Sequence, residues 1–551
     1  MFLAAIGSAL IGYWWEGGAL IFIFALSGAL ETYTTNKSRK EISSLMNIQP
    51  ESATLIEGGQ ERLIPIAMLN IGDRILVKPG ERIPADGVIV KGETTIDESA
   101  ITGESIPVRR EMNQEVFAGT MNVNGSITVE VTKKATDTLF QKIIHLVQSA
   151  QSEKSPSQLF IEKFEDTYVK IVLLAVIVMM VAPHYLFDWG WNETIYRAMV
   201  LLVVASPCAL VASIMPATLS AISNGARRGI LFKGGVHLEQ LSRIKAIAFD
   251  KTGTLTMGKP IVTDIIRLGD VDEDELLRIA ASIENHSNHP LGISIVNKYK
   301  KQALTTFYDV AHIEETPGLG IKGEIGGETW RIGQAEWFAD GCGFEDVAES
   351  LKKEGKTVVY IGNDAGLQGL IALKDTIRKE ALEAVKRLKR FGVHTVMLTG
   401  DNETTARAIA TEAGVDEYVA KCHPEEKLAQ IKKIKNKYGD TAMVGDGIND
   451  APALAAADIG IAMGDGTDVA LETADVVLMK NRLDKISYAI ELSKRMNRVV
   501  KQNIAFAIAV IVMLIISNFF EAINLPFGVV GHEGSTILVI LNGLRLLRGN
   551  V

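Results

Sequence analysis

Residues 246–256 read AIAFDKTGTLT, and this stretch decides the fold of the largest soluble part of the chain. Four apolar residues lead into Asp250, and small and polar residues follow it. A short apolar run of this kind is typical of a buried parallel strand. In open α/β sheets, ligands bind outside the carboxyl ends of the strands. Asp250 is therefore a candidate nucleophile, metal ligand or loop cap.

Two further strand ends decide among these roles. The run VMLTGDN carries Thr399 at its end, and the run AMVGDGIND carries Asp446 and Asp450. Lys427, in the segment HPEEK, comes shortly before the second run. Carboxylate oxygens suit Mg²⁺, and a lysine with a threonine hydroxyl can neutralise phosphoryl oxygens. The pattern predicts a Mg²⁺-assisted phosphoryl-transfer site.

The chain has 551 residues, which at about 150 residues per domain allows three or four domains. Its 47% hydrophobic and 22% charged residues are an ordinary average, but the apolar residues are concentrated in stretches. The net charge of −9 gives no electrostatic reason to expect a nucleic-acid partner. Six apolar stretches form three successive hairpins: Met1–Trp15 with Gly18–Tyr33, Val169–Leu186 with Ala198–Ile222, and Ile504–Phe520 with Pro526–Leu547. Most approach the roughly 20 residues that cross a bilayer, so we predict six membrane helices rather than six buried core helices.

Charge on the flanks of these stretches sets the predicted orientation. Basic residues follow the second and fourth stretches, precede the fifth and close the sixth, while the short turns on the other side are mostly acidic. The positive-inside rule then places both termini and both long loops in the cytoplasm of a multi-pass cell-membrane protein. Met1–Trp15 lacks a basic leader and a small-residue cleavage site, so we interpret it as a membrane helix and not a signal peptide.

The two long loops have different patterns. Ser38–Asp166 contains short β-like runs with turns, which predicts a small β domain, while Gly225–Asn497 alternates apolar strands with helical patterns, which predicts a parallel α/β sheet. About 140 residues separate two of its strands, too many for one crossover, so a second domain is expected between them. The predicted domains are 1–34 (two membrane helices), 35–166 (β-rich domain), 167–224 (two membrane helices), 225–256 with 373–497 (α/β domain), 257–372 (inserted α+β domain) and 498–551 (two membrane helices).

The segments DKTGT, TGDN and GDGIND resemble the motifs of the P-type ATPases, pumps that form an aspartyl-phosphate on a haloacid-dehalogenase-like domain. The resemblance implies that Asp250 accepts the γ-phosphate of ATP, and that Thr399 and Lys427 hold the phosphate. It assigns Mg²⁺ to Asp446, Asp250 and the backbone of Thr252, with Asp450 nearby. The related soluble phosphatases carry an acid–base aspartate where Thr252 stands here, and its absence would let the phosphoenzyme persist.

Two further segments also resemble motifs of this family. TGES, at 102–105, resembles the family's actuator motif, in which Glu104 would position the water that hydrolyses the aspartyl-phosphate. In the inserted domain, SIENHSNHPLG and ETPGLGIKG resemble the nucleotide-binding domain of the heavy-metal (P1B) branch. By themselves the histidine suits a helix cap and the glycines a turn. By resemblance, the adenine and ribose of ATP lie against Glu284, His289, Gly318, Gly320 and Gly333, while Gln334 stands where the family has asparagine.

The fourth and sixth apolar stretches carry the candidate transport site. Pro207 removes a backbone hydrogen bond and should break its helix next to Ser206 and Cys208. A lone membrane cysteine is otherwise an ordinary small buried residue. In the sixth stretch, the polar side chains are His532, Glu533, Ser535 and Thr536, where the alternative is a cap at the helix start.

SPC paired with HEGST resembles the P1B-4 subgroup, which is associated with cobalt, iron(II) and zinc. The resemblance assigns Ser206, Cys208, His532, Glu533 and Thr536 to the transported metal. A single thiolate beside imidazole, carboxylate and hydroxyl groups suits Zn²⁺, Co²⁺, Fe²⁺ or Cd²⁺ better than Cu⁺. Lys233, Gly234 and Gly235, just after the fourth apolar stretch, resemble the basic Gly-Gly platform through which the metal enters from the cytoplasm in this family. This match is weaker than that of SPC and HEGST.

We therefore expect a monomeric pump that uses ATP and Mg²⁺ to transport, by family expectation to export, a divalent transition metal across the lipid bilayer. The alternatives are a membrane-anchored phosphatase or sensor without transport, and a pump for another cation such as Cu⁺ or K⁺. Members of this branch usually have two more helices before this point and often a metal-binding domain; neither is in the sequence, so we expect a shortened or a naturally short member.

Overall fold

The computed structural model describes two compact units. The described residues are 2–46, 50, 52–99, 107–135, 138, 141, 155–287, 289–302, 306–316, 319–338, 345–447, 450–464 and 468–548. The first unit contains Met1–Arg243, Asp475–Lys480 and Tyr488–Val551, and the second contains Ile244–Ala474 and Asn481–Ser487.

The first apolar hairpin differs from its prediction. α1 (Phe2–Leu10) has nine residues and is about 14 Å long at 1.5 Å per residue. The helix ends there because Gly12 has φ +93°, a left-handed conformation that breaks the helix. The prediction of one helix over Met1–Trp15 is therefore wrong, since Trp14 already begins α2 (Trp14–Met46). The apolar part of α2 is Trp14–Leu30.

The other two hairpins supply four helical spans long and apolar enough to cross a membrane: Pro156–Leu186, Trp191–Arg227, Asp484–Phe519 and Leu525–Leu547. They correspond to α5 (Pro156–Leu186), α6 to α8 (Trp191–Val204, Cys208–Val211 and Met215–Arg227), α18 (Asp484–Phe519), and α19 (Leu525–Leu544) with the short turn η6 (Arg545–Leu547). The six-helix prediction is thus confirmed for four spans among the described residues. The predicted domain boundaries at 166 and 497 fall inside α5 and α18, which continue without interruption beyond the apolar stretches.

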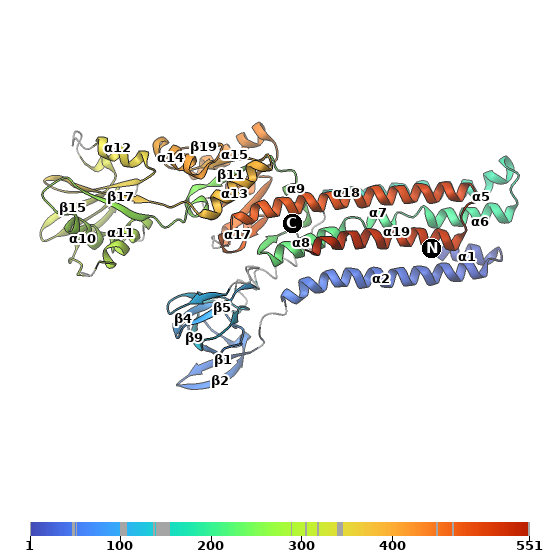
Figure 1. Ribbon diagram of the computed structural model, residues 1–551, viewed down its shortest axis with the longest axis horizontal. Coiled ribbons are helices and arrows are strands. Elements are labelled where there is room, and N and C mark those ends of the chain that lie inside the picture. The colour runs from blue at the N-terminus through green and yellow to red at the C-terminus, as the bar shows by residue number, and fades with distance from the viewer. Residues whose placement is uncertain are drawn as a thin grey trace. The chain divides into compact units, whose positions relative to one another are not determined.

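α19 is the central helix of the described membrane part, because it contacts α2, α6, α7 and α8. Figure 1 shows α2 and α19 running alongside each other. Asn503 of α18 joins this group through its side-chain amide, which donates to the backbone oxygens of Ser213 and Val539, each at 3.2 Å. A buried amide that bonds two backbone carbonyls connects α18 both to the segment between α7 and α8 and to α19.

Residues 52–131 form the β domain that the sequence predicts. A six-stranded antiparallel sheet has the order β2-β1-β3-β9-β4-β7, and a three-stranded sheet has the order β6-β5-β8. The strands are β1 (Ser52–Glu57), β2 (Gln60–Pro65), β3 (Arg74–Val77), β4 (Gly87–Lys91), β5 (Thr94–Asp97), β6 (Val108–Arg110), β7 (Glu115–Val116), β8 (Met121–Asn122) and β9 (Ile127–Val131). Alternate residues of β9, among them Ile127 and Val129, are buried in the core, as period-two patterning requires.

In the second unit, five parallel strands form the predicted α/β sheet in the order β21-β20-β11-β18-β19. They are β11 (Ala246–Asp250), β18 (His394–Leu398), β19 (Glu417–Val419), β20 (Thr441–Gly445) and β21 (Ile459–Met463). The associated helices are α13 (Lys379–Arg390), α14 (Glu403–Ala413), α15 (Pro424–Tyr438), α16 (Ala451–Ala456) and α17 (Asp468–Thr473). β11 lies at the centre, with β18 and β20 on either side, so its carboxyl end is flanked by two other strand ends.

The inserted domain is an antiparallel sheet in the order β12-β17-β16-β15-β14-β13. Its elements are β12 (Ile261–Arg267), α10 (Glu273–Glu284), α11 (Pro290–Lys300), β13 (Ala311–Thr316), β14 (Gly320–Ile325), β15 (Glu328–Gly333), α12 (Glu345–Lys353), β16 (Thr357–Asn363) and β17 (Gly366–Lys374). Buried side chains of α10 and α11, such as Leu276 and Ile295, pack with Trp330 and Ile332 of β15. The first and last strands of the insertion, β12 and β17, pair with each other.

Candidate functional site

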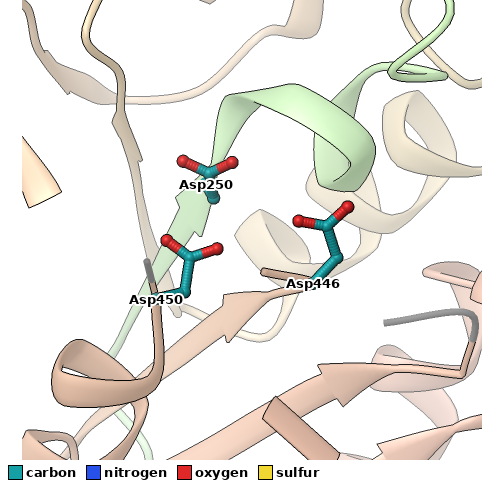
Figure 2. Close-up of side chains that lie close together, drawn as sticks. All are labelled: Asp250, Asp446 and Asp450. Carbon is teal, nitrogen blue, oxygen red and sulfur yellow. The ribbon is translucent and has the colours of Figure 1, made fainter. Parts of the chain in front are cut away.

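Three aspartates meet at the carboxyl edge of the parallel sheet. Asp250 is the last residue of β11, Asp446 directly follows β20, and Asp450 directly precedes α16. Ligand oxygens of all three lie within 4.8 Å of one another (Figure 2). They line a cavity of about 370 Å³ together with Thr252, Thr399 and other residues. The ends of these strands therefore converge, as the sequence predicts.

Lys427 lies between two of these carboxylates. Its Nζ is 2.5 Å from Oδ1 of Asp250 and 2.6 Å from Oδ1 of Asp450. The first turn of α15 positions it, because His423 caps that helix and the Glu426 carboxylate accepts from the His423 backbone N–H. The sequence predicts that Asp450 lies near Mg²⁺. In the structure, Asp450 contacts Lys427.

Burial determines the protonation of this cluster. Loss of solvent, followed by the Asp450 charge, raises the pKa of Asp250 to about 7. The same two causes raise the pKa of Asp446 to about 6. Burial alone would lower the pKa of Lys427, but the neighbouring carboxylates outweigh it and raise that pKa. Three clustered carboxylates with one ammonium have an excess of negative charge and hard oxygen donors, which fits a divalent cation such as Mg²⁺.

The loop after Asp250 must pass very close to Asp446. Gly253 has φ +73°, and a Cβ there would be 1.7 Å from Oδ2 of Asp446. Only glycine fits this place. Thr252, one residue earlier, is exposed and lines the cavity.

Two residues that sequence reasoning missed hold this loop from the other side. Arg378 donates from Nη2 to the Gly253 oxygen at 3.0 Å and from Nε to the Thr256 oxygen at 2.9 Å. Asp375 accepts from the Thr256 hydroxyl at 2.6 Å. Asp375 directly follows β17 and Arg378 comes three residues later, so the available signal was another polar strand end, in the run ALKDTIR.

Thr399 and its neighbours complete the edge. The Thr399 hydroxyl accepts from the Asp401 backbone N–H at 3.1 Å, and its side chain is buried at the cavity. Asp401 forms an ion pair with Lys251 at 2.8 Å, a contact that sequence reasoning did not anticipate. The residue after the candidate nucleophile is thereby tied to the end of β18.

In the inserted domain, a cavity of about 170 Å³ is lined by Glu284, His289, Gly320, Gly333 and Gln334, among others. Gly320 and Gly333 pair across β14 and β15, where a Cβ on either would lie about 2 Å from a backbone oxygen of the facing strand. The structure thus brings four of the five predicted nucleotide residues together. Gly318 lies outside the described residues.

Glu284 and His289 have distinct local roles in this cavity. His289 caps α11, because its Nδ1 accepts the Leu291 backbone N–H at 3.3 Å, so the capping role that its sequence suggested is present. Burial, with a smaller effect of Glu315, raises the pKa of Glu284 to about 7. A largely buried carboxyl of this kind can act as a hydrogen-bond donor near neutral pH.

In the membrane part, the predicted break at Pro207 is present. α6 ends at Val204, and helix resumes at Cys208. The Ser206 Oγ and Cys208 Sγ atoms lie 3.0 Å apart across the proline. A second interruption, at residues 212–214, separates α7 from α8. Sequence reasoning missed it, although Pro216 in the first turn of α8 was the available signal.

His532, Glu533, Ser535 and Thr536 are all buried in α19. The helix begins at Leu525 with Asn524 as its cap, so the interpretation of the polar cluster as a helix cap is wrong. Within the part of the chain that the structure describes, only the aspartate group above has three or more His, Cys, Asp or Glu ligand atoms within 4.8 Å of one another. Cys208 is therefore not gathered in one cluster with His532 and Glu533 here, although α7 and α19 are in contact. Glu104 lies outside the described residues.

Comparison with known proteins agrees with this geometry. Residues 244–458 match the haloacid dehalogenase-like hydrolase family, and residues 47–148 match the P-type ATPase actuator domain. An actuator domain, a haloacid-dehalogenase-like domain and membrane-spanning helices in one chain define a P-type ATPase. The chain belongs to the heavy-metal (P1B) family of these pumps, which are ATP-driven membrane transporters of divalent metals. The fold, family, activity and membrane location that the sequence predicted are thereby confirmed.

Individual relatives cover nearly the whole chain. The sequence is 55% identical over 551 residues to the zinc-transporting ATPase of Bacillus subtilis (strain 168), across all of this chain and 86% of that protein. It is 42% identical to the cadmium-transporting ATPase of Staphylococcus aureus, across all of this chain and 77% of that protein. The crystal structure of a zinc-transporting PIB-type ATPase in the E2·Pi state is 39% identical, with a TM-score of 0.66, across 99% of this chain and 89% of that one.

Proposed function

We propose that this protein exports a divalent transition metal through a phosphorylated Asp250 intermediate. The observation that carries the proposal is the carboxylate of Asp250 at the end of β11, held by Lys427 beside Asp446 and Asp450. A buried, oriented carboxylate next to an ammonium suits nucleophilic attack on a phosphoryl group, because the ammonium then faces the incoming negative charge. Thr252 supplies no carboxylate acid–base two residues later, so the phosphoenzyme lasts long enough to drive a conformational change.

In this proposal the residues of the edge share the tasks of the reaction. Asp250 attacks the γ-phosphate, and Thr399 and Lys427 hold phosphoryl oxygens. Asp446, Asp250 and the Thr252 backbone hold Mg²⁺, which when bound supplies positive charge against the phosphate. Arg378 fixes the loop that carries Thr252 by holding the Gly253 oxygen.

ATP binds the inserted domain at the cavity of Glu284, His289, Gly320 and Gly333. The family resemblance adds Gly318 to these residues. The two strand glycines let the backbones of the neighbouring strands approach closely at the wall of this cavity. Glu104 of the actuator domain positions the water that later removes the phosphate from Asp250.

The transported ion is coordinated by Ser206, Cys208, His532, Glu533 and Thr536, which come together when the metal binds. Zn²⁺, Co²⁺, Fe²⁺ and Cd²⁺ suit this mixed set of ligands, whereas Cu⁺ prefers several sulfurs. Export is supported by a relative from Mycolicibacterium smegmatis, described as a probable cobalt/nickel-exporting P-type ATPase, which is 40% identical across 99% of this chain and 84% of that protein. The protein works as a monomer in the lipid bilayer with its soluble domains in the cytoplasm. Its domains occur in the order predicted from the sequence, and α5 and α18 run through the predicted boundaries at 166 and 497.

Metal-stimulated ATPase activity of the purified protein tests the proposal. The assay compares Fe²⁺, Co²⁺, Zn²⁺, Cd²⁺, Ni²⁺ and Cu⁺ under anaerobic, reducing conditions, with acid-quenched labelling from γ-labelled ATP. We expect divalent metals to stimulate turnover and a hydroxylamine-labile label that Asp250→Asn abolishes. Label retained by Asp250→Asn would refute the assignment of the nucleophile. Turnover that no metal stimulates would favour a phosphatase or sensor, and turnover unchanged in Cys208→Ala would favour a K⁺-type pump.

A further inference from the structure

A serine of α2 contacts the proposed transport site from outside its recognised helices. The Ser27 hydroxyl donates to Oε2 of Glu533 at 2.5 Å, and both side chains are buried. Ser27 lies within the apolar part of α2, Trp14–Leu30, and α2 packs directly against α19. A carboxylate and a hydroxyl are thus paired inside an otherwise apolar helix contact.

This contact fixes the Glu533 carboxylate beside His532. Oε2 accepts from Ser27, while Oε1 lies 3.8 Å from Nε2 of His532. Among the described residues, neither ring nitrogen of His532 has a hydrogen-bond partner. A buried imidazole without a partner is costly unless something occupies it, and a metal ion is bound through such a nitrogen. The imidazole therefore remains available to a cation, and Ser27 holds the carboxylate next to it.

We propose that Ser27 is a positioning residue of the transported-metal site, which holds the Glu533 carboxylate in place for the ion. The inference rests on the proposed function of His532 and Glu533. Partners of metal ligands orient the ligand, and their removal typically weakens metal affinity by about 10- to 100-fold.

The competing explanation is that Ser27 only joins α2 to α19. Hydrogen bonds between membrane helices are worth about 0.6 kcal/mol on average, so such a contact would change stability slightly and leave metal preference unchanged. Metal affinity and metal preference therefore separate the two explanations, whereas protein yield or melting temperature does not.

The test uses full-length protein and measures, for Zn²⁺, Co²⁺ and Cd²⁺, the metal concentration that half-maximally stimulates ATPase activity. For Ser27→Ala we expect that concentration to rise about 10-fold or more, with turnover at saturating metal changed much less. Ser27→Thr keeps the hydroxyl and should stay close to wild type. Ser27→Cys places a thiol beside Glu533, and should shift the preference from Co²⁺ toward Cd²⁺, since soft sulfur favours Cd²⁺.

Ser8→Ala is the matched control. Ser8 is a buried serine of α1 whose hydroxyl donates to the Ala5 oxygen, so the variant removes the same group without touching Glu533. Metal responses of Ser27→Ala and Ser27→Cys that equal those of Ser8→Ala would overturn the proposal. A wild-type protein that no metal stimulates would instead refute the proposed function, so the two failures are distinguishable.

Discussion

Replacing Lys427 by Met tests how the aspartate cluster is held together. Its Nζ contacts Asp250 and Asp450 at 2.5 and 2.6 Å, and its side chain is 9% exposed. Removing one partner of a buried ion pair typically costs about 3–5 kcal/mol, because the remaining charges stay buried and uncompensated. Hydrogen exchange of full-length protein in EDTA at pH 8 should therefore accelerate in β11 and β20 by at least about 100-fold, since 1.4 kcal/mol is a factor of ten.

The loss of stability in Lys427→Met should depend on pH, because the pKa of Asp250 differs between the folded and unfolded states. The pKa of Asp250 is already raised to about 7 with Lys427 in place, against about 3.9 for an unfolded aspartate. A carboxyl whose folded pKa is raised contributes stability below its unfolded pKa, and that stability is lost as pH rises through the folded value. Without Lys427 the pKa rises further, so the defect should be smaller at pH 5.5 than at pH 8.

Lys437→Met serves as the control on the same helix. Lys437 pairs with Glu417 at 2.9 Å but is 58% exposed, and exposed pairs contribute about 0–1 kcal/mol. Adding Asp450→Asn to Lys427→Met should recover part of the protection, because it removes one of the two repelling charges. The reasoning is refuted if Lys427→Met exchanges no faster than Lys437→Met at pH 8, or if Asp450→Asn makes it worse.

Two further predictions follow from close contacts. Gly253→Ala should lower phosphorylation by ATP at least about 100-fold, because the added Cβ would displace Asp446 and the backbone has φ +73°. Acid-stable labelling measures the amount of phosphoenzyme, and near-normal labelling would contradict the close approach of Gly253 to Asp446. In the inserted domain, the raised pKa of Glu284, about 7, means that stability is highest below its unfolded pKa and falls as pH rises through 7, by at most about 3 kcal/mol. Exchange rates in α10, corrected for intrinsic chemistry, should show this fall, and Glu284→Gln should remove it; an equal fall in that variant would assign the pH dependence to another group.

The candidate catalytic edge could be predicted from the sequence because its signals are local. Each strand is a short apolar run, and each functional residue stands at or just after the end of its run, as Asp250, Thr399 and Asp446 do. Parallel strands carry their ends to one edge, so strand-end position alone was enough to group them. Pro207 acted in the same local way, since a missing N–H breaks a helix wherever it occurs.

The missed features depend on contacts between distant segments. Arg378 bonds the Gly253 oxygen across 125 residues, and Ser27 bonds Glu533 across 506. No periodicity or motif of a single segment encodes such a pair. The early end of α1 was missed for a different reason, because Gly12 sits in an apolar run whose hydropathy continues through the turn.

The pairing of β12 with β17 has a mechanical consequence for the pump. β12 and β17 carry the chain into and out of the inserted domain, and they are adjacent strands of its six-stranded sheet, so their cross-strand hydrogen bonds hold the two connections together. Next to these connections, Thr256 bridges to Ile377 and Arg378 donates to the Gly253 carbonyl. The two connections therefore form one coupled unit, and a displacement of the inserted domain would be transmitted to the peptide group three residues from Asp250.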